Sequence, residues 1–260
     1  MMRGIFAIVI LDLKRFWLDR ARLIAGLIQP LLYLFVLGAG IGASSKMGGG
    51  DYRRFIFPGT MGLSLLFSAT FAAITIVFDR QIGFFKAVLV APVPRPAIAL
   101  GKIAAGALQS FAQGLVLLPF APLAGASLGF LQTIEMLGAM ALAATTFSTI
   151  GVAFACRFNS TTVFPIVSNA VLLPMFFLSG GLYPLRMAPA WMQVAAQFDP
   201  VAYAVDLMRG SVMGTFFFPV WQSLGALALT ISLLVWAAVR VFNRGEDDSS
   251  LGATKFNFRR

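Results

Sequence analysis

Long, uninterrupted apolar runs dominate this chain of 260 residues and restrict it to one class of fold. Each run has about twenty residues, enough for an α-helix to cross the roughly 30 Å hydrocarbon core of a membrane. Strands of a membrane barrel would instead alternate apolar and polar residues. Because 59% of the residues are hydrophobic and only 12% are charged, the chain also lacks the polar surface of a soluble domain. The sequence predicts an all-α integral membrane protein.

The apolar runs predict six transmembrane helices within one transmembrane domain that covers residues 1–260. The predicted spans are residues 23–43, 55–78, 98–123, 131–156, 161–182 and 218–242. The other segments are a helix in the membrane surface (3–20), a short polar loop (44–54), a second loop (79–95), a polar insert (183–217) and a charged tail (243–260). This order places the loop 79–95 and the insert 183–217 on opposite sides of the membrane.

Residues 3–20 have the pattern of an amphipathic helix. Apolar residues recur at helical spacing, and the charged residues lie largely on the other side. The apolar residues are Ile5, Phe6, Val9, Leu13, Phe16 and Trp17, and the charged ones are Arg3, Asp12, Lys14, Arg15 and Asp19. This pattern favours a helix that lies in the membrane surface with its charged side in water. An extended cytosolic start to the first span is the alternative.

The basic residues indicate which side of the membrane each loop faces. If the N-terminus lies inside, fifteen of the twenty Lys and Arg residues fall in inner segments and five in outer ones. Because basic residues concentrate in cytoplasmic loops, we expect both termini in the cytoplasm and an even number of spans. The residues behind the formal charge of +10 flank apolar runs, which favours contact with membrane lipid and not with nucleic acid.

The sequence lacks the residue patterns of an enzyme. It has no histidine, which removes the commonest metal ligand and the usual base for a serine nucleophile. The single Cys156 is expected to fill an apolar site. No G-x-x-x-x-G-K-[ST] phosphate cradle occurs, since Gly101-Lys102 has Pro96 in place of the first glycine and Ile103 after it. We expect no catalytic residue, metal site or cofactor on this chain, and an intramembrane hydrolase is disfavoured.

Charged residues are almost absent from the predicted spans. Glu135 lies near the outer end of the fourth span, where it could either reach the membrane interface or contact a substrate. A charge at mid-bilayer costs roughly 3 kcal/mol on insertion scales. A carrier coupled to protons or sodium would be expected to bury acids. We therefore expect the energy for transport to come from a separate, soluble partner.

The insert between the last two spans contains a short polar helix. Asp199 can accept a hydrogen bond from a free N–H at a helix start, and Pro200 suits the first helical position. Asp206 and Arg209 are three residues apart, so their opposite charges can meet on one helix face. A capped helix with its own ion pair between two spans indicates a transport pathway whose opening is formed by an ordered helix.

The inner loop after the second span combines a charged pair, an amphipathic stretch and a proline stop. Its apolar side could insert into a groove on a cytosolic protein. A helix resting on lipid headgroups is the alternative, and the physical pattern leaves both open. The residues of interest in this loop are Asp79, Arg80, Gly83, Phe84, Lys86, Leu89 and Pro92.

Together, these segments resemble the type-2 ABC exporter permeases. The inner loop is similar to their coupling region through Asp79-Arg80, Gly83, Lys86 to Leu89, Ala91-Pro92 and Gly101-Lys102. The late segment is similar to their re-entrant outer helices through Ser179 to Pro184, Ala188 to Trp191, Asp199 to Tyr203 and Asp206-x-x-Arg209-Gly210. The resemblance covers nearly the whole chain. Members often have Asn at the position of Asp199, and Glu with Gly-Thr where this chain has Asp79 and Ile82-Gly83-Phe84, which leaves the subgroup open.

The resemblance implies the permease subunit of an ATP-driven exporter in the cell inner membrane. It implies a homodimer or heterodimer of permeases paired with two ABC ATPase subunits, which bind the ATP and Mg²⁺. Closure of the ATPases would push on residues 79–95 and on the N-terminal surface helix. A hydrophobic or amphipathic substrate such as a drug, lipid or glycan would leave the cytoplasm or inner leaflet. The implied outer gate consists of Gly180, Gly181, Tyr183, Pro184, Asp199, Pro200, Tyr203, Asp206 and Arg209.

Two alternatives stay open at this point. The chain could be a membrane scaffold or assembly subunit that transports nothing, and co-purification of an ATPase chain separates this from the permease. The aromatic residues Tyr183, Trp191 and Tyr203 could belong to the gate. They could equally be anchors at the membrane interface, where aromatic rings keep their polar tips wet.

Overall fold

The computed structural model describes residues 2–40, 49–81, 95–158 and 160–244, and the regular structure in these residues is helical throughout. The helices are α1 (Met2–Leu18), α2 (Arg20–Leu32), α4 (Gly49–Gln81), α6 (Arg95–Leu117), α7 (Phe130–Ala155), α8 (Val163–Leu178), α9 (Ala190–Gln197), α10 (Pro200–Met213) and α11 (Val220–Arg244). A π-helical stretch (Tyr33–Leu37) continues α2. Short 3₁₀ turns follow α6 (Leu118–Phe120, Pro122–Ala124) and precede α9 (Leu185–Met187). The all-α prediction is confirmed for this part of the chain.

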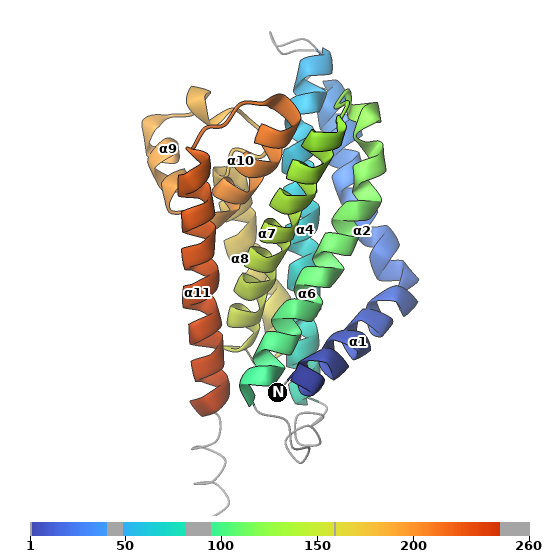
Figure 1. Ribbon diagram of the computed structural model, residues 1–260, viewed down its shortest axis with the longest axis vertical. Coiled ribbons are helices and arrows are strands. Elements are labelled where there is room, and N and C mark those ends of the chain that lie inside the picture. The colour runs from blue at the N-terminus through green and yellow to red at the C-terminus, as the bar shows by residue number, and fades with distance from the viewer. Residues whose placement is uncertain (1, 41–48, 82–94, 159, 245–260) are drawn as a thin grey trace, which may run out of the picture.

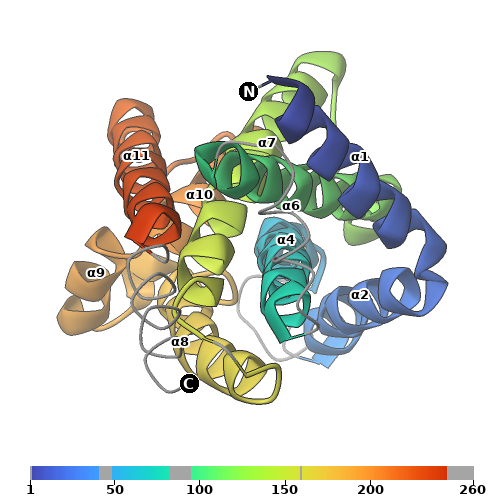
Figure 2. The same ribbon diagram turned by 90° about the horizontal axis from the view of Figure 1, so that it is seen from below.

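Helices α2, α4, α6, α7 and α11 run along the long axis of a bundle (Figure 1). Helix α1 lies across one end, and α9 and α10 lie at the other (Figure 1). Seen from the α1 end, α1 lies against α6, while α2 and α11 stand on opposite sides of the bundle (Figure 2). Helix α4 packs against α2, α6, α7, α8 and α10, so these five helices are arranged around it.

Five segments of the described chain are long and apolar enough to span a membrane. They are Arg20–Gly40, Tyr52–Gln81, Pro96–Phe120, Phe130–Ala155 and Val220–Val241, and they correspond to five of the six predicted spans. The remaining prediction, 161–182, corresponds to α8, whose 16 residues extend only about 24 Å. This helix ends at Leu178 because the chain turns at Gly180, which has a φ of +71°.

The boundary predicted between the loop 44–54 and the second span is wrong, because α4 already begins at Gly49. Tyr52 is buried in the first turns of this helix, and its hydroxyl donates a hydrogen bond to the carbonyl oxygen of Leu182 at 3.0 Å. A contact with a segment far away in the sequence therefore fixes this polar stretch. A local pattern of polar residues carries no information about such a contact.

Helix α1 has the predicted helical form, but one of its charges faces the protein. The Asp12 side chain is buried, whereas Phe6 and Trp17 are 67% and 56% exposed. The prediction that the charged side of this helix faces water is therefore wrong for Asp12. The reason is that Lys102 of α6 places its Nζ atom 2.9 Å from the Asp12 carboxylate.

Small residues let α4 approach its neighbours closely. Gly59 of α4 faces the main chain of Gly181, so a Cβ atom at Gly59 would meet the carbonyl oxygen of Gly181. Near the other end of the helix, Gly151 of α7 lies against Ala73 of α4. Close approach of this kind is the main source of helix association in a membrane, where apolar contact alone gives little advantage over lipid.

Replacing Gly59 with alanine is expected to destabilise the bundle by about 1–3 kcal/mol, because the added methyl group overlaps main-chain atoms that cannot rotate away. Thermal unfolding of the purified protein in detergent, followed by tryptophan fluorescence, measures this change. Gly138→Ala is the matched control, because Gly138 is also helical but has no atom within 4 Å of its Cβ position. Equal melting temperatures for the two variants would contradict the close contact at Gly59.

Candidate functional site

Helix α10 carries two charged side chains and is enclosed by other helices. Every residue from Val201 to Val212 is buried, since α10 packs against α4, α7 and α11. The predicted cap is confirmed: Asp199 Oδ1 accepts a hydrogen bond from the Val201 N–H at 2.8 Å, and Pro200 occupies the first helical position. The residues that start this helix are neighbours in the sequence, and they were sufficient to predict where it begins. Its burial is a tertiary feature that they did not indicate.

Arg209 connects α10 to the turn that follows α8. Its guanidinium donates a hydrogen bond to the carbonyl oxygen of Gly180 at 2.7 Å and lies over the Phe55 ring, 4.1 Å from the ring centroid. A cation over an aromatic face is stabilised further when water is excluded, and Arg209 is only 6% exposed. Arg209 therefore joins α10, α4 and the Gly180 turn in one contact.

Asp206 holds the segment between α10 and α11. Its carboxylate accepts hydrogen bonds from the Phe217 N–H at 2.9 and 3.0 Å and from the Phe218 N–H at 3.0 Å. Burial raises the pKa of Asp206, and these two main-chain donors and the charge of Arg209 act in the opposite direction. The carboxylate thus accepts the hydrogen bonds that the N–H groups of Phe217 and Phe218 would otherwise donate to water.

The predicted direct ion pair between Asp206 and Arg209 is wrong. Each side chain bonds to main-chain atoms of a different segment, Arg209 to Gly180 and Asp206 to Phe217 and Phe218. Burial lowers the pKa of Arg209 to about 10, and the Asp206 charge offsets part of that effect. The two charges therefore attract each other at longer range without forming a bridge. Spacing along a helix shows which side chains can meet, but not which other partners compete for them.

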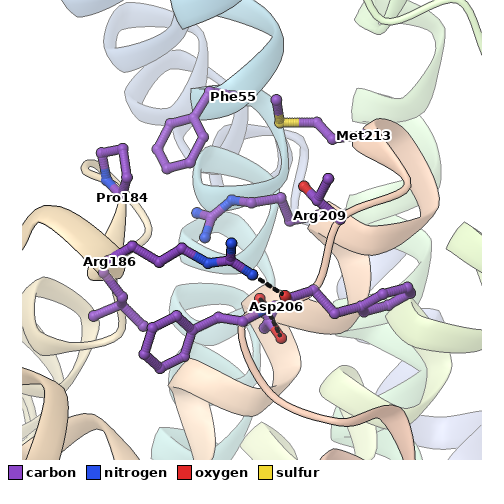
Figure 3. Close-up of a pocket in the computed structure, with 10 residues that line it drawn as sticks. Phe55, Pro184, Arg186, Asp206, Arg209 and Met213 are labelled. Carbon is purple, nitrogen blue, oxygen red and sulfur yellow. Dashed lines mark hydrogen bonds between the residues drawn. The ribbon is translucent and has the colours of Figure 1, made fainter.

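A small cavity of about 210 Å³ lies between α10, the Gly180 turn and the start of α4. Figure 3 shows Arg186 and Arg209 extending toward each other across it, with Phe55 and Met213 beside them. The Arg186 side chain donates a hydrogen bond to the carbonyl oxygen of Phe216 at 3.1 Å. The lining residues are Phe55, Pro184, Leu185, Arg186, Asp206, Arg209, Met213, Thr215, Phe216 and Phe217. Sequence reasoning missed Arg186 and Phe55, because no local motif connects them to α10.

The aromatic and acidic candidates at this end of the bundle differ in how far they are buried. Trp191 is 64% exposed, and the Tyr183 hydroxyl donates to the Phe177 carbonyl oxygen at 2.7 Å. Tyr203 is buried, and its ring lies 4.4 Å from that of Phe218, so an interface role is wrong for this residue. Glu135 is exposed in the first turns of α7, so no other part of the described chain covers its side chain.

At the α1 end, the structure describes only two of the predicted coupling residues. Asp79 is buried, and its Oδ2 atom lies 2.8 Å from Lys102 Nζ. Arg80 donates a hydrogen bond to the carbonyl oxygen of Cys156 at 3.0 Å. The other candidates lie outside the described residues; they are Gly83, Phe84, Lys86, Leu89 and Pro92.

Two buried charged residues lie near the ends of candidate spans at the α1 end of the bundle. Asp79 lies within the span Tyr52–Gln81, and Lys102 lies within the span Pro96–Phe120. Both side chains are buried and paired, which offsets part of the cost of removing them from water. Within the described ranges, no group of His, Cys, Asp and Glu side chains could hold a metal ion.

A larger groove of about 670 Å³, the α2–α4 groove, opens between these two helices. Its lining combines polar groups such as Arg22, Gln29 and Ser64 with aromatic ones such as Phe71 and Phe78. Phe71 and Phe78 are 50% and 48% exposed, so their rings are available for contact. The lining therefore suits a molecule that has both a polar and an apolar part.

Exchanging the two charges of α10, as Asp206→Arg with Arg209→Asp, is expected to leave the protein as unstable as either single reversal. An arginine at 206 cannot accept hydrogen bonds from the N–H groups of Phe217 and Phe218, and an aspartate at 209 cannot donate to Gly180. The melting temperature and the monodisperse fraction in size-exclusion chromatography measure the outcome. Recovery of wild-type values by the exchange would show that a direct pair is the main interaction.

The stability of the protein is expected to depend on pH through Asp199. Burial raises the pKa of Asp199 from 3.8 to about 7, although its bond from Val201 acts against this. Its Oδ2 atom is buried without a hydrogen-bond partner in the described part of the chain. Because the folded state binds the proton more tightly than the unfolded chain, stability falls as pH rises between these two values.

Asp199→Asn removes this titration but keeps an oxygen that can cap α10. The variant is expected to melt higher than the wild type at pH 8, and the difference should shrink at pH 5. Asp199→Ala is the control, because it removes the charge and the cap together and is expected to lose about 1 kcal/mol relative to the asparagine variant. A constant difference between wild type and Asp199→Asn at both pH values would rule out this dependence.

Comparisons with known proteins agree with this architecture. The ABC-2 type transporter family model matches residues 3–213. The Nodulation protein J of Rhizobium leguminosarum bv. trifolii is 30% identical over 230 residues, which cover 86% of each chain. A Mycobacterium tuberculosis protein named "Probable doxorubicin resistance ABC transporter permease protein DrrC" is 26% identical over 229 residues, covering 87% of this chain and 79% of its own.

These similarities extend from α1 through α10 and so include both ends of the bundle described above. They confirm the resemblance that the coupling and outer segments indicated in the sequence. The chain belongs to the ABC-2 type transporter family of membrane transport permeases.

Proposed function

We propose that this chain is the membrane-spanning permease subunit of an ATP-driven exporter. The observation that carries the proposal is the family match over residues 3–213, which includes the whole helical bundle except α11. The sequence contains no phosphate cradle of its own, so the ATP would be bound and hydrolysed by a separate ABC ATPase subunit. The chain itself then contributes the path through the membrane and needs no cofactor.

The proposed topology has six crossings, with both termini in the cytoplasm of a cell whose inner membrane holds the protein. The start of α1 and the end of α11 lie at the same end of the bundle (Figure 1). The last residue of α4 and the first of α6, on either side of residues 82–94, lie at that end too (Figure 1). In this topology α8 is the fifth crossing, and α9 and α10 form a re-entrant hairpin at the extracytoplasmic end of the bundle.

The proposed partner surface is the α1 end of the bundle. Residues 79–95 would contact the ATPase subunit through the apolar side of this segment, as the family resemblance implies, and α1 would lie beside them. Two permease chains, identical or different, would form the channel. Closure of two ATPase subunits would then act on both chains together.

The proposed substrate is amphipathic, and the α2–α4 groove supports this class. It offers Arg22, Gln29 and Ser64 to a polar group and the Phe71 and Phe78 rings to an apolar one. The name of the Mycobacterium tuberculosis relative refers to resistance to a drug, doxorubicin. A molecule of this kind that partitions into the inner leaflet would enter the groove from the side.

The test is export by the reconstituted complex. The chain is purified with the ABC ATPase subunit that co-purifies with it and placed in vesicles with doxorubicin and a fluorescent phospholipid as separate probes. ATP-dependent movement of either probe, absent when the ATPase chain is omitted, supports the proposal. A complex that hydrolyses ATP and moves no probe from a panel of drugs, lipids and glycolipids would favour the scaffold alternative. Movement by the isolated chain without ATPase would overturn the proposal.

Phe84→Asp and Leu89→Asp are each expected to lower transport per ATP hydrolysed by about tenfold, because a charge on the apolar side weakens contact with the ATPase. Insertion into the membrane should be unchanged, since both residues lie outside the predicted spans. Phe130→Asp is the matched control: Phe130 is 86% exposed and begins α7 at the opposite end. Normal export by both variants would count against the coupling role of residues 82–94.

A further inference from the structure

Three charged residues from three helices meet at the α1 end of the bundle. Lys102 Nζ of α6 lies 2.9 Å from Asp12 Oδ2 of α1 and 2.8 Å from Asp79 Oδ2 of α4. It also lies 3.5 Å from the hydroxyl of Thr75. An ammonium group has three N–H donors, and three acceptor residues surround this one. We call Asp12, Asp79 and Lys102 the charge cluster.

The charge cluster is buried and electrically almost balanced. The side chains of Lys102, Asp12 and Asp79 are 8%, 4% and 5% exposed. Arg15 supplies a second positive charge from the surface of α1, 3.5 Å from Asp79 and 3.8 Å from Asp12. Two carboxylates thus face two cations. Charges buried in this way are tolerated only while all partners remain in place, because each would otherwise be left without water or a counter-charge.

Further hydrogen bonds tie the same turn of α1 to the bundle. The carbonyl oxygen of Asp12 accepts a hydrogen bond from Gln109 Nε2 at 3.2 Å, and Gln109 Oε1 accepts one from Arg22 at 3.1 Å. Arg22 also donates to the carbonyl oxygen of Ser68 at 3.3 Å. The main chain and side chain of Asp12 are therefore both bound to α6, and the chain of contacts continues through α2 to α4.

The charge cluster brackets the segment that links α4 to α6. Asp79 stands two residues before the end of α4 at Gln81, and Lys102 stands seven residues after the start of α6 at Arg95. Both ends of the segment 82–94 are thus joined to each other and to Asp12 of α1. A force on that segment reaches the charge cluster through short, rigid stretches of helix.

We infer that Asp12, Asp79 and Lys102 are positioning residues that make α1 and the two ends of the segment 82–94 move as one body. The inference rests on the proposed function, since it assigns the charge cluster a role in transmitting ATPase movement to the spans. It goes beyond the proposed function because it states that α1 does not move relative to α6 during the transport cycle. The cluster acts as a clamp between α1, α4 and α6, and its strength comes from the lack of water around it.

The first experiment measures whether the charge cluster holds α1 in place, independently of transport. Ile8 of α1 is partly buried against Gly101 of α6, so this contact shields part of a cysteine side chain at position 8. In a Cys156→Ala background, Ile8→Cys is labelled with N-ethylmaleimide in the purified complex. Lys102→Met keeps the apolar stem but removes the charge, and is expected to raise the labelling rate about tenfold. Lys14→Met is the matched control, because Lys14 is exposed on α1 outside the charge cluster.

If Lys102→Met does not yield folded protein, Asp12→Asn takes its place. Asparagine retains the shape and one acceptor oxygen but removes the negative charge that faces Lys102. Faster labelling of Ile8→Cys in this variant supports the inference. Unchanged labelling in a folded charge-cluster variant overturns it.

The second experiment asks whether α1 and α6 separate during the cycle. In the Cys156→Ala background, cysteines at positions 8 and 101 are close enough to form a disulfide, because the Cβ of Ile8 is 3.1 Å from the ideal Cβ position at Gly101. A disulfide has its Cβ atoms roughly 3.5–4.5 Å apart, so the two helices need to separate by a few tenths of an ångström. Oxidation of the Ile8→Cys, Gly101→Cys double variant is expected to leave ATP-driven export of the chosen probe unchanged. Introduced together with Asp12→Asn, which removes only the charge that α1 contributes, the disulfide is expected to restore most of the transport per ATP hydrolysed that this variant loses.

The outcomes separate the two proposals. If the cross-linked complex hydrolyses ATP but exports nothing, and reduction restores export, α1 must move against α6 and the inference fails while the proposed function stands. If the wild-type complex exports nothing, the proposed function fails, and the labelling rates still decide whether the charge cluster holds α1. If the disulfide does not rescue Asp12→Asn, Asp12 does more than position α1 against α6, which also overturns the inference.

Discussion

The attraction between Lys102 and the buried carboxylates of Asp12 and Asp79 determines how the amino-terminal half of the protein is arranged. Without water, none of the three charges can be left alone, so α1, α4 and α6 must meet where they do. This requirement explains why a helix with an amphipathic sequence turns a charged residue inward. It also explains why α1 exposes large apolar side chains such as Phe6 and Trp17. Those side chains are free to contact lipid because the polar contacts of the helix are made within the protein.

The other end of the bundle follows the same physical rule with different partners. Arg209 and Asp206 are satisfied mainly by main-chain groups of the Gly180 turn and of the segment before α11. Helix α4 connects the two ends. Its 33 residues extend about 50 Å, with Phe55 under the Arg209 guanidinium near one end and Asp79 in the charge cluster at the other. One continuous helix therefore contributes to the polar contacts at both ends of the permease.

Local sequence signals identified the elements but not their partners. The cap at Asp199 and the proline after it predicted the start of α10, because both act within one turn of their own helix. The same segment predicted an ion pair between Asp206 and Arg209 that the structure replaces with two separate contacts. Hydrogen-bond partners such as Gly180 lie in other helices or turns. Nothing in the spacing of residues along one helix indicates that these groups compete for its charges.

The sequence by itself determined that this protein is an all-helical membrane chain, where five of its long helices lie, and to which family it belongs. These properties depend on the length of apolar runs and on short motifs, which a chain carries whether or not it is folded. Only the tertiary structure decided that Asp12 faces inward, that α8 is too short to match the long spans, and that Lys102 joins three helices. Those features depend on which polar groups are buried beside one another. The packing of segments that are far apart in the sequence decides this.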